Sequence, residues 1–267
     1  MNILDIILAN KRQELKLAKE LTSVKELEQS PLFSRQCYSA RQFIKRSDKS
    51  GIIAEFKRAS PSKGVINDKV SVKEVTTGYA SAGASCLSIL TDQKFFGGST
   101  ADILEAREYN TLPILRKDFI IDEFQIIEAK SIGADMILLI AECLNAQEVK
   151  HLASFAKSLG VEVLMELNQL EEIDKICPEL SLVGVNNRDL RTFNVDVNRS
   201  IEIGKYIPNE FVKVSESGLS NPEDVKKLKL HGFDGFLMGE AFMKTANPAI
   251  SCSQFIKDAE LIKLGCM

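Results

Sequence analysis

Charged side chains stand where several apolar runs of the sequence end, and their types suit acid–base chemistry. Glu55 and Lys57 close the run that begins at Ile52 and share one face of an extended chain, because side chains alternate with period two. Lys117 and Glu166 close two later runs, each in phase with the apolar residues before it. A carboxylate beside an ammonium can transfer protons or hold an anion. An inward Lys117 near Lys57 would have its pKa lowered by burial and by like charge, which suits a proton donor near neutral pH. The alternative is that these charges face solvent on the outer surface.

Amide, guanidinium and glycine residues follow the later runs and indicate a site for anions. Asn186 and Arg188 on one face suit recognition of a carboxylate, although the two consecutive asparagines there could equally form a turn. Gly218 and Gly239 each end a run, and backbone N–H groups at such glycines and at a following helix N-terminus could hold a phosphate dianion. Plain glycine turns are the alternative. Glu240, beside such a phosphate, would have to turn its side chain away and contribute its backbone N–H.

The segment 58–64 has the sequence RASPSKG, which predicts a loop because it combines serine, proline and glycine. Its cations could close over an anionic ligand bound at the ends of the strands. An ordinary basic loop without a ligand is the alternative.

Cysteine and histidine usage limits the chemistry further. The six cysteines form no CxxC pair, which indicates reduced and mostly buried thiols in a cytoplasmic protein; they are Cys37, Cys86, Cys143, Cys177, Cys252 and Cys266. The two histidines, His151 and His231, fall in stretches with a helical pattern. A histidine-dependent triad and a histidine-rich metal site are therefore not expected, and carboxylates, lysines, arginine and amides must carry any reaction.

These polar residues would be positioned by eight short apolar runs that alternate with helical patterns. The runs begin at Ile52, Ser85, Leu112, Asp135, Val161, Leu182, Val212 and Asp234, roughly 20 to 35 residues apart. That spacing fits one strand–helix unit, and runs apolar on both faces are typical of parallel strands covered by helices. We therefore predict an α/β (β/α)8 TIM barrel, in which the active site lies at the carboxyl ends of the strands. An open doubly wound sheet is the alternative, and no GxGxxG turn follows the first run to support it.

The joints and the first 50 residues complete the expected architecture. Gly83, Gly133 and Gly232 each end a helical pattern before a strand, as expected of left-handed glycine caps. Asn221 followed by proline and acidic residues predicts a helix start. Apolar residues at helical spacing in residues 1–50 predict an N-terminal helical extension that packs over one barrel end, a frayed tail being the alternative. Residues 1–267 would form a single barrel domain.

Composition excludes several classes of protein. Hydrophobic residues make up 45% and charged residues 27%, the usual balance of a globular protein, with a formal charge of -3. Without a basic excess a nucleic-acid partner is not expected. No apolar run approaches the roughly 20 residues of a membrane span, and the N-terminal apolar stretch is broken by Asp5 and Asn10, unlike a secretory signal. We expect a cytoplasmic location with no membrane contact.

The strings IAEFKRASPSKG, ILRKDFIID, LMELN, VGVNNRDL, VSESGL and GFLMGEAFM occur in this order across nearly the whole chain. With the N-terminal helical extension, the sequence resembles the indole-3-glycerol phosphate synthase family. The resemblance implies a TIM barrel and a step of tryptophan biosynthesis. In that step 1-(2-carboxyphenylamino)-1-deoxyribulose 5-phosphate closes its indole ring and loses carbon dioxide and water, with no metal or organic cofactor. The chain length implies a single activity, without a fused phosphoribosylanthranilate isomerase, and we expect a monomer.

The resemblance also assigns roles to residues of this sequence. The catalytic positions would be Glu55, Lys57, Lys117 and Glu166; the substrate-binding positions Ser60, Asn186, Arg188, Glu216 and Ser217; and the phosphate-binding positions Gly218, Gly239 and Glu240. Family members often carry serine where Glu240 stands. Two other functions remain open: a different phosphate-handling barrel enzyme, such as an isomerase of a phosphorylated sugar amine, and a phosphate-ligand binder without catalysis.

Overall fold

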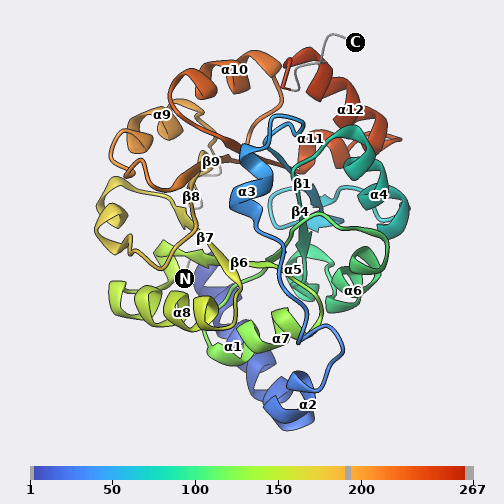
Figure 1. Cartoon of the computed structure of the whole chain (residues 1–267), viewed down its shortest axis with the longest axis vertical. Helices are drawn as coiled ribbons and strands as arrows, with labels where there is room; N and C mark the ends of the chain where they lie inside the picture. The colour runs from blue at the N-terminus through green and yellow to red at the C-terminus, as the bar shows by residue number, and fades with distance from the viewer. Residues whose placement is uncertain (1–2, 190–193, 262–267) are drawn as a thin grey trace.

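The computed structural model describes residues 3–189 and 194–261, and its centre is a closed barrel of eight parallel strands (Figure 1). The strands are β1 (Ile52–Phe56), β4 (Cys86–Leu90), β5 (Ile114–Lys117), β6 (Met136–Ile140), β7 (Glu162–Leu167), β8 (Leu182–Asn186), β9 (Val212–Glu216) and β10 (Gly235–Met238). Each is hydrogen-bonded to its neighbours in chain order, and β1 closes the circle by pairing with both β10 and β4. The prediction of a TIM barrel is confirmed, strand by strand, and the open sheet is excluded.

Apolar side chains on both faces of the strands build two cores. The outward-facing side chains, such as Ile89 and Val183, pack against the surrounding helices. The inward-facing ones, such as Leu115, Leu164 and Val214, fill the barrel interior. Because period two is maintained along every strand, the polar residues at the strand ends inherit a defined inward or outward direction.

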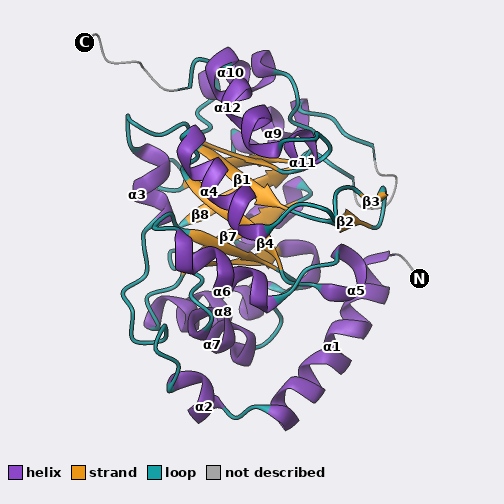
Figure 2. Cartoon of the chain, turned by 90° about the vertical axis from the view of Figure 1, so that its right-hand side faces the viewer, coloured by secondary structure: helices purple, strands orange, loops and turns teal. Residues whose placement is uncertain are grey.

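Within residues 3–189 and 194–261, seven α-helices and one longer 3-10 helix lie around the barrel strands (Figures 1 and 2). They are α4 (Val72–Ala82), α6 (Thr100–Tyr109), α7 (Glu123–Ser131), α8 (Ala146–Ser158), η2 (Leu170–Lys175), α9 (Asn198–Gly204), α10 (Pro222–Leu230) and α12 (Pro248–Asp258). The unit after β7 therefore departs from the expected strand–helix repeat, since η2 takes the place of an α-helix. The predicted joints are confirmed: Gly83, Gly133 and Gly232 have φ of 98°, 92° and 82°, and Asn221 caps α10.

The N-terminal segment folds into α1 (Ile3–Leu21), α2 (Val24–Glu28) and α3 (Ala40–Lys45). In Figure 1, α3 lies across the barrel opening that faces the viewer, and its Ile44 joins the interior core. The side view in Figure 2 shows α1 running toward the opposite end of the barrel, the end at which β2 (Ala59–Ser60) and β3 (Gly64–Val65) lie. There the ammonium of Lys11 is buried against Asp92 and Asp118, at 3.0 Å and 2.8 Å. The boundaries of the domain, 1–267, and of the extension, 1–50, stay predictions, and residues 1–2 lie outside the described ones.

A buried carboxylate joins the N-terminal extension to the end of the barrel at which the strands begin. Asp135 accepts hydrogen bonds from the guanidinium groups of Arg35 and Arg107 and from the backbone N–H groups of Tyr38 and Ile114. Asp135 is fully buried and Arg107 is 8% exposed. Segments about a hundred residues apart in sequence thus meet at one carboxyl group.

Replacing Asp135 by asparagine should lower the free energy of unfolding by about 3–5 kcal/mol, because it leaves the buried guanidinium of Arg107 without its counter-charge. Urea unfolding followed by circular dichroism measures the change. Asp48→Asn is the matched control, because its ion pair with Arg46 is exposed, and it should leave the unfolding midpoint unchanged. Equal midpoints for the two variants would show that the Asp135 network does not hold the extension.

The five cysteines within the described residues are free, and Cys86, Cys177 and Cys252 are buried; Cys266 lies outside those residues. Among the helices that the structure describes, none is both long and apolar enough to cross a membrane.

Candidate active site

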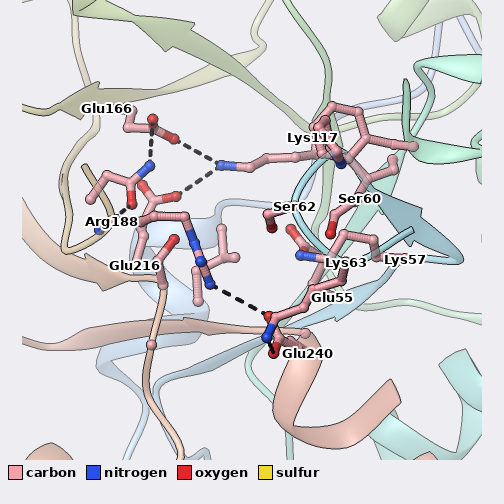
Figure 3. A pocket seen from close by; sticks show the side chains of 18 of the residues that line it. Glu55, Lys57, Ser60, Ser62, Lys63, Lys117, Glu166, Arg188, Glu216 and Glu240 are labelled. Atoms are coloured by element: carbon pink, nitrogen blue, oxygen red, sulfur yellow. Dashed lines mark hydrogen bonds and ion pairs between the residues drawn. The ribbon is translucent and has the colours of Figure 1, made fainter. Parts of the chain in front are cut away.

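A pocket of about 550 Å³ opens at the carboxyl ends of the strands. All the residues predicted for the site from the strand ends line it, together with residues of α1 and of the segment after β1. The lining includes Glu55, Lys57, Ser60, Lys117, Glu166, Asn186, Arg188, Glu216, Ser217, Gly218, Gly239 and Glu240. Residues separated by more than 180 positions in sequence thus meet in one cavity (Figure 3). The alternative of charges on the outer barrel surface is excluded for Glu55 and Lys117.

The ammonium of Lys117 lines this cavity and points at the carboxylates of Glu166 and Glu216 (Figure 3). Its Nζ donates to Oε2 of Glu166 at 3.0 Å and to Oε2 of Glu216 at 2.9 Å. The three groups come from β5, β7 and β9, alternate strands whose inward side chains share a layer of the barrel. Glu166 and Glu216 are 4% and 1% exposed, so this triad of charges is shielded from bulk water.

The pKa expected for Lys117 is wrong in direction. Burial alone would lower the pKa, but the charges of Glu166 and Glu216 outweigh it and raise the pKa above its ordinary value. The like-charged Lys57, which was expected to lower it, instead pairs with Glu55, with Nζ 2.8 Å from Oε1. Lys117 is therefore an ammonium throughout the physiological pH range.

The two carboxylates around Lys117 are driven apart in pKa. Burial raises the pKa of Glu216 to about 7; the charge of Lys117 opposes this shift and that of Glu166 adds to it. Burial also disfavours the ionised form of Glu166, but Lys117 and the amide of Asn186, 2.9 Å from Oε1, lower its pKa overall. Two carboxyl groups with separated pKa values in one pocket are typical of acid–base sites.

The Glu55–Lys57 pair sits on the opposite wall of the pocket from Glu166. Oε2 of Glu55 accepts a hydrogen bond from Ser88, and the side chain is 3% exposed. Gly239 leaves the space for it, because a Cβ at this position would lie 2.6 Å from Oε1 of Glu55. The glycine after β10 thus has a steric reason in addition to the phosphate role that the sequence suggested.

The side chain of Glu240 differs from its expected orientation. Instead of turning away from the pocket, it lines it, with Oε2 3.5 Å from the guanidinium of Arg188 and Oε1 3.9 Å from the ammonium of Lys63 (Figure 3). The cause is electrostatic, since two cations face this carboxylate across the cavity mouth. Glu240 is the first residue of the short helix α11 (Glu240–Met243), which follows Gly239, so its backbone N–H lies at the start of that helix.

The segment after β1 contains a small hairpin rather than a plain loop. Strands β2 (Ala59–Ser60) and β3 (Gly64–Val65) pair antiparallel and carry Ser60 and Lys63 over the pocket. Arg58 does not line the pocket, contrary to expectation, because its guanidinium forms a bidentate pair with Asp102 at 2.5 Å and 2.9 Å. Oγ of Ser60 is buried and has no hydrogen-bond partner in the described part of the chain.

The turn after β9 has an unusual backbone. Ser217 has φ of 66° and Gly218 of 75°, and a left-handed conformation at a residue other than glycine costs about 1–3 kcal/mol. The amide of Asn187 holds the turn by donating to the backbone oxygen of Ser217 at 3.1 Å. Asn187 itself is buried and bonded to Ser200 and Ser215, so it supports the turn rather than lining the pocket.

Sequence reasoning missed the apolar walls of the site. Phe119 and Phe96 line the pocket with ring centroids 6.2 Å apart, and Phe96 ends the short helix α5 (Gln93–Phe96). Ile3, Leu4 and Ile7 of α1 add an aliphatic wall. The alternation of side chains on strands cannot find these residues, because they lie on helices and turns; the apolar face of α1 was the available signal for part of them.

Comparison with known proteins identifies the family. The family model described as indole-3-glycerol phosphate synthase matches residues 4–255. The indole-3-glycerol phosphate synthase of Bacteroides thetaiotaomicron is 48% identical over 256 residues, which cover 96% of this chain and 98% of that protein. The protein of the same name from Polaromonas sp. strain JS666 is 40% identical over 257 residues, covering 95% and 97%.

A solved structure supports the fold independently. A mutant tryptophan synthase alpha-subunit from Pyrococcus furiosus superposes with a TM-score of 0.60, at 16% sequence identity, over 80% of this chain and 99% of that one. At this identity the likeness shows the fold alone. The family match and the two relatives cover nearly the full length, so the resemblance drawn from the sequence motifs is confirmed. The chain therefore belongs to the indole-3-glycerol phosphate synthase family, and its function is the carboxy-lyase step of that name in tryptophan biosynthesis.

Proposed function

We propose that Lys117 is the general acid of this step, in which the aromatic ring of 1-(2-carboxyphenylamino)-1-deoxyribulose 5-phosphate attacks the ketone carbon. The supporting observation is that Glu166 and Glu216 hold the ammonium of Lys117 in the wall of the pocket. A lysine has three N–H donors, and two of them serve these carboxylates, so the third can reach the ketone oxygen. As that oxygen gains charge it becomes more basic than the amine, and the proton moves to it.

The carboxylate that leaves as carbon dioxide needs cationic and amide partners until the bond breaks. Lys57 lines the same pocket as Lys117, and its side chain is 17% exposed. Asn186 and Arg188 supply an amide and a guanidinium from the end of β8. We assign Lys57 to hold the carboxylate and the other two to orient it, since guanidinium groups bind carboxylates with defined geometry.

Dehydration of the ring intermediate needs one group to remove a proton and another to protonate the departing hydroxyl. Glu166 and Glu55, on opposite walls, are assigned to these two transfers. Glu216 and Ser217 are assigned to substrate binding, with Glu216 also fixing Lys117. Each acid–base group is expected to supply a factor of about 10²–10⁴ in rate.

The phosphate is assigned to the turns after β9 and β10. The backbone of Gly218 has φ of 75°, a conformation in which successive N–H groups can converge on an anion. Gly239 and the backbone N–H of Glu240 would approach from the neighbouring turn, and the buried hydroxyl of Ser60 would contact the sugar portion. The carboxylate of Glu240 would have to move away from the part of the cavity in which the phosphate binds.

We further propose that the protein acts as a cytoplasmic monomer whose partner is this phosphorylated small molecule. The net charge of -3 gives no support to a nucleic-acid or membrane partner. The assigned proton transfers use side chains alone, so the proposal requires no cofactor.

The proposal predicts both the products and the pH dependence of the reaction. With the named substrate, carbon dioxide and the fluorescent indole product should form in equal molar amounts. An isomerase would release no carbon dioxide, and a phosphate-ligand binder without catalysis would form no product. Burial raises the pKa of Glu216 to about 7, so below this pH Glu216 is neutral and its ion pair with Lys117 is lost. We therefore expect kcat/KM to rise with pH up to about 7 and to level above it.

The rise of kcat/KM with pH up to about 7 is called the acidic limb of the profile. The variant Glu216→Gln tests whether Glu216 causes this limb, because the amide of the glutamine cannot titrate. Its kcat/KM should be lower and independent of pH between about 5 and 7. An unchanged acidic limb in this variant would assign the titration to another group and contradict the role given to Glu216. The exposed Glu223, which pairs with Lys226 on α10, provides the control variant Glu223→Gln, which should keep the limb.

A further inference from the structure

A glycine lies in the middle of β8, where a glycine is not expected. Gly184 pairs laterally with Glu166 of β7 and with Val214 of β9, so it is part of the closed ladder. A glycine inside a strand weakens it, because it contributes no side chain to the core and has more freedom to lose on folding. Such a position often marks a place where another group approaches the backbone closely.

The group that approaches is the carboxylate of Glu216. A Cβ built on Gly184 would lie 2.1 Å from Oε1 of Glu216, 3.2 Å from its Cδ and 3.3 Å from Cδ1 of Leu164. The carboxylate thus sits in the slot that the missing side chain leaves. Its Oε1 is buried there with no hydrogen-bond partner in the described residues, while Oε2 accepts from Lys117 at 2.9 Å.

We infer that Gly184 is a positioning residue for the reaction: the slot above its backbone holds the Glu216 carboxylate at the one place from which it can bind the Lys117 ammonium. This inference rests on the proposed roles of Lys117 and Glu216. A methyl group in the slot has to push Oε1 away by more than 1 Å to reach ordinary van der Waals separation. The carboxylate then moves, and Lys117 loses one of its two anchors.

The expected effect falls on catalysis rather than on folding. The atoms that meet the new methyl group belong mainly to the flexible end of a glutamate, which can rotate within the 550 Å³ cavity. Gly204, at the end of α9, offers the opposite case. A Cβ there would lie 2.7 Å from the rigid ring of Phe233, which is 2% exposed and locked in the outer core.

Gly184→Ala and Gly204→Ala are therefore a matched pair of variants. For Gly184→Ala we expect kcat to fall about 10- to 100-fold, since misplacing a reacting group by about 1 Å costs up to that factor, with KM changed less than about threefold. Its melting temperature should stay within about 3 °C of the parent. For Gly204→Ala we expect the reverse: a melting temperature lower by about 3–10 °C and an unchanged kcat. A Gly184→Ala variant with parental kcat, or one that loses stability as Gly204→Ala does while its folded fraction keeps full turnover, overturns the inference.

A double-mutant cycle with Glu216→Ala separates positioning from a general disturbance of the barrel. Without the carboxylate there is nothing in the slot to displace, so adding Gly184→Ala to Glu216→Ala should change kcat less than about twofold. Equal losses from Gly184→Ala in both backgrounds would overturn the inference. A crystal structure of Gly184→Ala provides a readout that does not depend on activity. Oε2 of Glu216 should lie beyond hydrogen-bonding distance of Nζ of Lys117, and an unchanged 2.9 Å contact would also overturn the inference.

These outcomes are distinct from a failure of the proposed function. If Lys117 is not the general acid, Lys117→Met keeps its turnover, whatever Gly184→Ala does. If Glu216 has no part in the reaction, Glu216→Ala keeps its kcat, and both its assigned role and the positioning role of Gly184 are then wrong.

Discussion

Lys117→Met should lower kcat by a factor of at least about 10²–10⁴ while the barrel remains folded. Methionine is unbranched like lysine and only one heavy atom shorter, but it cannot donate a proton or carry charge, so the ketone oxygen loses its acid. The neighbouring carboxyl groups of Glu166 and Glu216 can adapt to the loss of the cation by taking up a proton, which limits the effect on the fold. Steady-state fluorescence of the indole product measures kcat, and circular dichroism with thermal unfolding verifies the fold.

Lys94→Met is the matched control for this variant. Lys94 belongs to α5, close to the pocket in sequence and space, but its ammonium is exposed and bonded to Asn10 rather than directed at the cavity. Its kcat should stay within about twofold of the parent, as for a typical surface substitution. Near-normal turnover in Lys117→Met would show that another group protonates the ketone.

Glu166→Gln should have the second largest effect, a fall in kcat of about 10²–10³-fold. Glutamine keeps the size of the side chain but can neither take up a proton in dehydration nor balance the charge of Lys117. The loss of one carboxylate also removes part of the interaction that raises the pKa of Lys117. Because substrate contacts from other strands remain, KM should change far less than kcat, and steady-state kinetics separates the two.

The same strand provides the control for Glu166→Gln. Glu162 stands at the opposite end of β7 and accepts hydrogen bonds from the hydroxyl of Ser39 and the backbone N–H of Arg41. Glu162→Gln should weaken the seating of the N-terminal extension and lower the melting temperature, with kcat preserved. If Glu166→Gln instead resembles Glu162→Gln, with lower stability and full turnover, Glu166 has a structural role and the assignment is wrong.

The barrel and the strand-end residues could be predicted because both follow from local patterns. Apolar runs at regular spacing specify the strands, and period two gives the inward direction of Lys117 and Glu166. The glycine caps and the Asn221 helix start depend on neighbouring residues alone, and they too were found correctly. Local rules, however, do not state which strand ends face one another across the cavity.

The sequence-based predictions that are wrong depend on contacts between residues far apart in the sequence. The lowered pKa that the sequence predicts for Lys117 is wrong, because nothing in the sequence places Glu216, 99 positions away, against its ammonium. Arg58 turns to Asp102, and Glu240 turns to Arg188, for the same reason: each partner is distant in sequence. The glycine slot at Gly184 also required the structure, because its reason is the position of another strand's side chain.

A crystal structure with bound indole-3-glycerol phosphate would show whether the assigned residues surround the ligand. We expect the phosphorus beside the backbone N–H groups of Gly218 and Gly239, and the indole ring between Lys117 and the aromatic wall of Phe96 and Phe119. Lys57, Lys117 and Glu166 should all lie within about 4 Å of the ligand, close to hydrogen-bonding range. A ligand whose phosphate lies away from both glycines, or whose ring leaves Lys117 and Glu166 out of contact, would show that the assigned roles are wrong.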